Sequence, residues 1–175
     1  HFIGEENKLG ISVSFFDDKG NEQKSPGDIG TVSFERSSDL DKIKVVASVH
    51  NVRYGFIQNE KKKDGTQTIH CIVTDADLKV MRNIRFDVPY PEKNFYYENW
   101  LLSDEGDFVV EGCYNSRDNN PNRRRWDAYK LFVSTRETMD AKEYAINNSE
   151  IELSGSNIAF DALKNKLVLA GFYNE

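Results

Sequence analysis

One strand-like phrase occurs three times in this chain, at intervals of roughly 60 residues. Lys44–Asn51 aligns with Phe108–Asn115 and with Leu167–Asn174, and each copy joins a run of apolar residues to a closing asparagine. A repeat of this length that is rich in strand-forming residues is typical of a small β unit that stacks against its own copies. The sequence therefore predicts a β repeat protein.

Each repeat is predicted to contain four short strands. The second strand is the nearly continuous apolar phrase, a pattern typical of a strand that is buried on both faces. The third strand alternates apolar and polar residues with a period of two, as at Ile69, Cys71 and Val73. Helix propensity alone would allow a helix at Thr138–Ile146, but the matching residues near Val80 alternate, so we expect a strand there.

A four-stranded antiparallel sheet that repeats radially is the blade of a β-propeller. We therefore predict an all-β fold, a β-propeller-like array of about three four-stranded antiparallel blades. The array forms a single domain over residues 1–175, with repeat units near 8–65, 66–126 and 127–175. Because a closed ring usually has about four to eight blades, we expect this chain to be part of a larger propeller. A β-sandwich and an open solenoid of sheets are the alternatives.

The composition narrows the class of protein. The chain is 38% hydrophobic and 30% charged, yet it has 11 Phe and 8 Tyr, too many aromatic residues for a disordered chain. No apolar run approaches the roughly 20 residues that span a bilayer, so no transmembrane segment is predicted. The net charge of -6 argues against nucleic acid as a partner.

The two cysteines, Cys71 and Cys113, lie in predicted strands at positions that other copies fill with apolar residues. We expect two small buried side chains, and a disulfide between neighbouring strands is the alternative. No metal site is predicted, because neither cysteine has a second cysteine or a histidine at a ligand spacing.

Three connections between strands are predicted to be long and to share one face of the array: Asn51–Thr66, Val88–Asn99 and Asn115–Trp126. Together they carry a net positive charge and several aromatic residues, whereas the whole chain is acidic. Long loops at one end of a rigid scaffold are a usual place for binding, and a basic surface favours an anionic partner. The alternatives are solvated loop tips and aromatic rings that fill seams between blades. The predicted ligand-binding residues are Arg53, Tyr54, Lys61, Lys62, Lys63, Tyr96, Arg123, Arg124, Arg125 and Trp126.

Glu111 interrupts the apolar run of a predicted buried strand, at the position where the sister copies have Ala47 and Ala170. A buried carboxylate requires a partner or a raised pKa. We expect an ion pair with a nearby arginine or exposure at the rim of a blade, and a catalytic acid is the less favoured alternative.

Recurring aspartates are interpreted as turn formers, because they occupy matching turn positions in several copies. They are Asp17, Asp39, Asp75, Asp104 and Asp161. The segment Asp17–Asn21 resembles the start of a calcium loop but lacks its final acidic ligand. No catalytic residue, metal or cofactor is predicted.

Two stretches resemble the blade signature of uncharacterised propeller-like repeat proteins of the cell envelope in Bacteroidetes-type bacteria: Phe86–Gly112 and Asn157–Tyr173. The resemblance implies a propeller fold and an exported location, which is periplasmic, outer-membrane-associated or extracellular. It supplies no activity. We therefore expect a non-enzymatic binding or scaffold module for an anionic glycan or protein partner. A propeller-type glycan hydrolase or lyase fragment is the alternative.

Overall fold

The structure is a computed structural model that describes residues 8–33, 43–115, 127–146, 152–164 and 166–174. Within these ranges the regular structure consists of β-strands and one short 3-10 turn. The strands are β1 (Lys8–Phe16), β2 (Glu22–Ser33), β3 (Lys44–Ala47), β4 (Arg53–Lys61), β5 (Gln67–Asp75), β6 (Val80–Val88), β7 (Phe95–Leu102), β8 (Phe108–Tyr114), β9 (Ala128–Ser134), β10 (Lys142–Ala145), β11 (Glu152–Asp161) and β12 (Lys166–Asn174), and the 3-10 turn is η2 (Glu92–Asn94).

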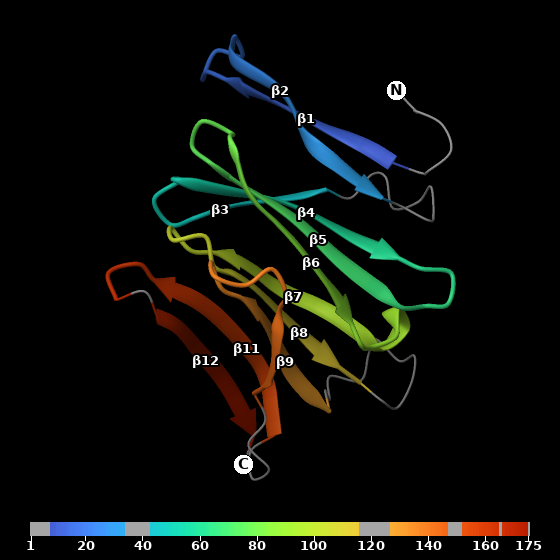
Figure 1. Cartoon of the computed structure of the whole chain (residues 1–175). Coiled ribbons are helices and arrows are strands. Elements are labelled where there is room, and N and C mark those ends of the chain that lie inside the picture. The colour runs from blue at the N-terminus through green and yellow to red at the C-terminus, as the bar shows by residue number, and fades with distance from the viewer. Residues whose placement is uncertain (1–7, 34–42, 116–126, 147–151, 165, 175) are drawn as a thin grey trace.

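Consecutive strands pair antiparallel into four sheets. They are the N-terminal hairpin β1–β2, a first sheet β3–β6, a second sheet β7–β10 and the C-terminal hairpin β11–β12. Figure 1 shows them stacked in chain order, with the two ends of the chain at opposite ends of the stack. The all-β, antiparallel prediction is confirmed. The described residues form an open stack and do not close into a ring, so the propeller itself stays a prediction.

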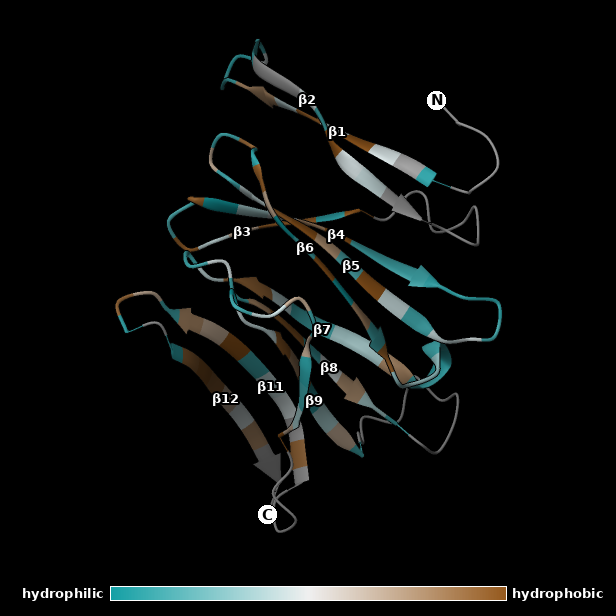
Figure 2. Ribbon diagram, viewed as in Figure 1, coloured by the Kyte–Doolittle hydropathy of each residue, from teal (hydrophilic) through white to brown (hydrophobic). Residues whose placement is uncertain are grey.

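The inner strands of each four-stranded sheet are buried on both faces, because successive side chains point to opposite sides and a neighbouring sheet or hairpin lies on each side. In β4, Phe56 packs with Ile11 of the N-terminal hairpin, whereas its neighbour Ile57 belongs to the core between the two larger sheets. In β8, Val110 joins that central core and Val109 packs with residues of the C-terminal hairpin. The brown, hydrophobic segments of the inner strands in Figure 2 follow these layers.

The connections emerge at two opposite edges of the stack. The turns that join the first strand of a sheet to its second, such as β3/β4, β7/β8 and β11/β12, lie on the left of Figure 1. We call this side the turn edge. The β4/β5 turn and η2 lie on the right, and we call this side the loop edge. The alternation follows from antiparallel pairing of consecutive strands, in which the chain reverses at each turn.

The prediction of a long loop at Asn51–Thr66 is wrong. Most of it is β4, which pairs along its whole length with β5 and leaves only a tight turn at Lys62–Thr66. Asn51 closes the β3/β4 turn with a positive φ of 56°. The predicted match between Lys44–Asn51 and Phe108–Asn115 is therefore wrong by one strand, because the structural counterpart of Phe108–Tyr114 is Arg53–Lys61.

The buried character predicted for the second strands holds in one copy only. Phe108–Cys113 is buried throughout, as expected. Lys44–Ala47 is instead the short outer strand of its sheet and is largely exposed. The outer face of β12 is also exposed, since no further sheet of the described structure covers it; Val168, for example, is 51% exposed. The strand predicted near Thr138–Ile146 is confirmed as β10.

Candidate binding edge

The turn edge is cross-linked between sheets by polar contacts. His50 of the β3/β4 turn contacts Asp104 of the β7/β8 turn through Nδ1 and Oδ2 at 2.6 Å, and its backbone N–H donates to the same carboxylate at 3.1 Å. These hydrogen bonds hold the pKa of Asp104 below its ordinary value. Within the second sheet, Asp107 of the β7/β8 turn accepts a hydrogen bond from the backbone N–H of Arg136 in the β9/β10 turn at 2.6 Å.

Arg82 of β6 is the largest of these connections and was missed by sequence reasoning. Its guanidinium donates to the Gly106 carbonyl at 2.7 Å, to Ser134 Oγ at 2.9 Å and to the Thr138 carbonyl. A single side chain of the first sheet thus binds two turns of the second sheet. Arg82 lies on the same face of β6 as Ile84 and Phe86, toward the second sheet, but the strand pattern gives no local signal of its partners.

Asp17, Asp75 and Asp161 bond to the backbone of their own turns, as predicted, whereas Asp104 bonds to His50 of another turn. Asp17 accepts hydrogen bonds from the backbone N–H groups of Lys19 and Asn21 at 2.9 and 2.8 Å. Asp75 makes the same pair of bonds to the residues two and four positions later, both at 2.9 Å. Bonds from Asn21 lower the pKa of Asp17. No cluster of potential metal ligands occurs among the residues that the structure describes. Asp39 lies outside them.

The loop edge joins the β4/β5 turn to the segment around η2. The backbone N–H of Glu92 donates to the Gly65 carbonyl at 3.1 Å, and the Glu92 carboxylate forms an ion pair with Lys61. Gln67 Nε2 donates to the Tyr90 carbonyl at 3.2 Å. These bonds hold two segments from the first and second sheets next to each other.

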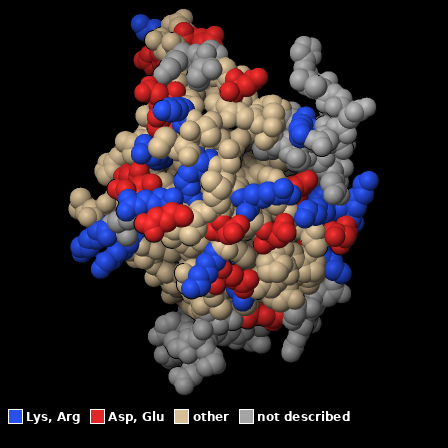
Figure 3. Space-filling model, in the orientation of Figure 1, with Lys and Arg blue, Asp and Glu red and all other residues tan. Residues whose placement is uncertain are grey.

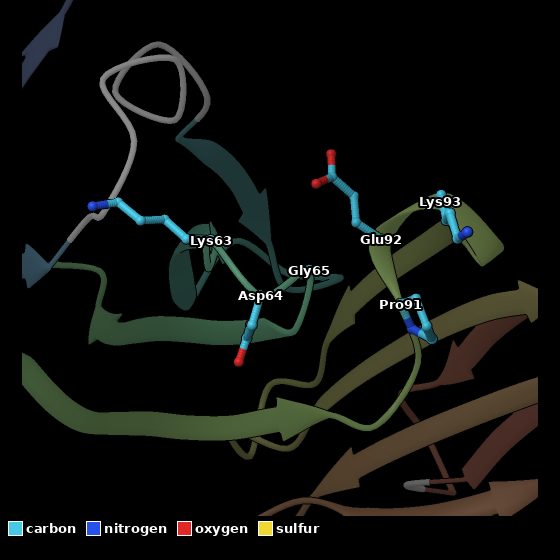
Figure 4. Close-up of a pocket in the computed structure, with 6 residues that line it drawn as sticks. All are labelled: Lys63, Asp64, Gly65, Pro91, Glu92 and Lys93. Atoms are coloured by element: carbon cyan, nitrogen blue, oxygen red, sulfur yellow. The ribbon is translucent and has the colours of Figure 1, made fainter.

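A shallow depression of about 530 Å³ lies between these two segments. Its lining residues are Lys63, Asp64, Gly65, Pro91, Glu92 and Lys93. Figure 4 shows Lys63 and Lys93 on opposite sides of it, with the Glu92 carboxylate projecting between them. The floor is backbone and proline, and the rim carries side chains of both signs.

The segment with the arginine run starts and ends at this edge. Asn115 and Asn94 are joined by two hydrogen bonds, one from the Asn115 backbone N–H at 3.0 Å and one from Asn94 Nδ2 to the Asn115 carbonyl at 2.7 Å. The Asp127 N–H donates to the Tyr114 carbonyl at 2.9 Å. Arg123, Arg124, Arg125 and Trp126 themselves lie outside the described residues.

The other predicted binding residues are split between the two edges. Lys61, Lys62 and Lys63 lie at the loop edge, where Lys62 is 3.5 Å from the Asp87 carboxylate. Arg53 lies at the opposite end of the nine-residue strand β4 and donates to the Val52 carbonyl at 2.8 Å. The grouping of Arg53 with these lysines is therefore wrong, because the predicted loop is a strand.

The predicted aromatic residues also have separate environments. Tyr54 packs into the core beneath the N-terminal hairpin, with its ring 5.9 Å from that of Phe15. Tyr96 is 39% exposed on β7. Most rings near η2 fill the seam between the two large sheets, where Tyr90 stacks on Phe95 at 5.2 Å. This outcome matches the alternative that aromatic residues close seams.

A triad that the sequence did not indicate completes the loop edge. Tyr90 Oη donates to Glu143 at 2.6 Å, and Lys130 Nζ lies 2.8 Å from the same carboxylate oxygen. Partial burial and the bond to Glu143 raise the pKa of Tyr90. Burial opposes ionisation of Glu143, but the bonds from Lys130 and Tyr90 lower its pKa overall. The triad ties the η2 segment to β9 and β10.

Glu111 is fully buried, and its partners are neutral. Asn99 Nδ2 donates to it at 2.6 Å and Ser156 Oγ donates to its other oxygen. The expected ion pair with arginine, or exposure at a rim, is therefore wrong. The carboxylate lies under β11 and connects the second sheet to the C-terminal hairpin, without access for a reactant in this structure.

Cys71 and Cys113 are free, buried thiols, and the disulfide alternative is wrong. Burial raises the pKa of both thiols, and for Cys113 the nearby Glu98 carboxylate adds to the effect. A thiol with a raised pKa forms little of the reactive thiolate. The two cysteines therefore act as small core residues.

Charges of both signs alternate over the face shown in Figure 3, without a basic patch set apart from the acidic residues. In the described part of the chain no helix is long and apolar enough to cross a membrane. Comparison of the chain with known protein families, with curated proteins and with solved structures found no match.

Proposed function

We propose that this chain is a non-enzymatic binding and scaffold module that docks an acidic glycan at its loop edge. The depression between the β4/β5 turn and η2 is the observation that carries the proposal. Exposed lysines at positions 63 and 93 flank it, and the segment with three consecutive arginines is anchored next to it at Asn115 and Asp127. Exposed cations beside a backbone floor suit the carboxylates or sulfates of a polysaccharide.

The scaffold part of the proposal rests on the stacking of the sheets. The turn edge is occupied by contacts between sheets, such as those of Arg82, and these contacts join the two sheets whose connections form the loop edge. The exported location expected from the resemblance to envelope repeat proteins remains part of this proposal. An acidic protein surface is the alternative partner.

A glycan array at low ionic strength tests the proposal, with uronate-containing, sulfated and neutral glycans side by side. We expect binding to acidic members only and weakening as salt is added, because exposed charges are screened within about 10 Å at 0.1 M salt. Binding to acidic proteins but to no acidic glycan would assign the loop edge to a protein partner and would refute the proposal that its ligand is a glycan.

Two charge-reversal variants locate the site. The loop-edge variant combines Lys63→Glu, Lys93→Glu and Arg124→Glu. The matched control reverses three exposed lysines of the turn edge, and its changes are Lys19→Glu, Lys79→Glu and Lys164→Glu. We expect at least a tenfold loss of affinity in the first variant and little change in the second. Equal losses in both would mean that net charge, and not the loop edge, determines binding.

A further inference from the structure

The two terminal hairpins are complementary halves of one four-stranded sheet. The first strands of successive sheets lie against each other, since β3 contacts β7 and β7 contacts β11. The C-terminal hairpin β11–β12 therefore corresponds to the first and second strands, β7–β8. The N-terminal hairpin β1–β2 corresponds to the third and fourth, because its Asp17 turn repeats the hydrogen bonds of the Asp75 turn between β5 and β6.

Apolar side chains are exposed at both ends of the stack, where the other two strands of each incomplete sheet would lie. At the C-terminal end, Tyr144 of β10 is 45% exposed and Leu169 of β12 is 37% exposed. Register places both on the layer between the second sheet and the C-terminal hairpin, where third and fourth strands would cover them. At the N-terminal end, Val45 is 57% exposed on the same face as Phe56, where first and second strands would lie.

As a second strand, β12 corresponds to β8, which pairs with β7 on one edge and with β9 on the other. β12 pairs with β11 on its first edge, and its other edge pairs with no strand of the described structure. β1 presents the matching edge at the other end of the stack, and both strands have nine residues. An unpaired edge strand is a template for antiparallel addition of another strand.

We propose that β12 of one molecule pairs antiparallel with β1 of a second copy of this chain, so that two half-sheets form one complete sheet. The contact is heterologous, from head to tail. Two copies joined at both ends close a ring of six four-stranded sheets, which lies within the usual range for a propeller.

The two complete sheets predict the register of this pairing. In the first sheet Tyr54 lies opposite Thr74, and at the equivalent position of the second sheet Phe108 lies opposite Ser134. The same register places Leu167 opposite Phe16, and three residues further Ala170 opposite Val13. Directly opposed residues on neighbouring strands have Cβ atoms about 5 Å apart, within reach of a disulfide after a small adjustment.

Cysteine cross-linking between two single variants tests the inference. A Val13→Cys protein is mixed with an Ala170→Cys protein and oxidised gently. The matched control replaces Ala170→Cys by Asn157→Cys, which lies next to Ala170 on β11 and is therefore one strand further from the joint. We expect a covalent dimer in the first mixture and none in the second, because the extra strand adds about 5 Å. The native Cys71 and Cys113 are buried and do not interfere.

Sedimentation of the unmodified protein over a wide concentration range gives the second measurement, with a dimer expected. A monomer at every concentration together with no cross-link overturns the inference. Equal cross-linking of the Asn157→Cys control overturns the assigned edge. A Val13→Cys/Ala170→Cys double variant that closes a disulfide within one chain would show that the ends of a single molecule meet, and would overturn the second copy.

Discussion

Arg82 is predicted to be the main polar connection between the two four-stranded sheets. Its guanidinium makes three hydrogen bonds to the second sheet, two of them to turn carbonyls at Gly106 and Thr138. A hydrogen bond to a charged group contributes about 1.5–3 kcal/mol to stability. Because water can reach the turn carbonyls once the Arg82 side chain is removed, we assign about 1 kcal/mol to each of the three bonds. Arg82→Ala should therefore lower the free energy of unfolding by about 3 kcal/mol.

Urea and thermal denaturation followed by circular dichroism measure this loss. For a chain of this size each kcal/mol corresponds to about 2–4 °C in Tm, so a fall of about 6–12 °C is expected. Arg82→Lys should recover part of the loss, because an ammonium group cannot reach all three acceptors in the planar arrangement of a guanidinium.

Arg85→Ala is the matched control. Arg85 is an exposed arginine in the same strand, three residues away, and its truncation should change the free energy of unfolding by less than about 0.5 kcal/mol. If Arg82→Ala and Arg85→Ala proved equally stable, the bonds of Arg82 to the turns would contribute nothing net, and the account of the turn edge would be wrong.

Two further predictions concern a close contact and a titrating pair. Gly112→Ala should lower the free energy of unfolding by about 1–3 kcal/mol in the same denaturation assay, because an added Cβ would lie 2.3 Å from the buried Phe95 ring. Gly10→Ala is the control, since there is open space around Gly10. Equal losses of stability in the two variants would refute the steric argument. The bond from His50 lowers the pKa of Asp104 in the folded protein. The stability that this bond contributes is therefore present above about pH 4, and it is lost as the pH falls through the pKa of Asp104 in the folded state. Asp104→Asn should therefore be less stable than the parent at pH 7 but not at about pH 2, and a difference that persisted in acid would contradict the assignment.

Polar residues in a buried strand explain why a loop was predicted where β4 lies. β4 contains Gln58 and Glu60, both nearly inaccessible, so its hydropathy is typical of a loop. Glu60 is compensated by His70 of β5 at 2.9 Å, a partner that only strand pairing brings into reach. Nothing in the described structure bonds to the Gln58 amide. The grouping of Arg53 with the lysines was wrong for the same reason, because the predicted loop that contained both is mostly strand β4.

Some parts of the structure could be predicted from local chemistry. Alternating side chains and aspartate-centred turns act over a few residues, so the strands around Asp17 and Asp75 and their antiparallel pairing follow from the sequence. Whether a strand is buried on both faces is a different matter, because it depends on a sheet lying on each side. Phe108–Cys113 lies between two sheets, whereas the similar phrase in β12 lies at the end of the stack and is exposed. The position in the stack, and with it the edges open to a partner, is decided only by the tertiary arrangement.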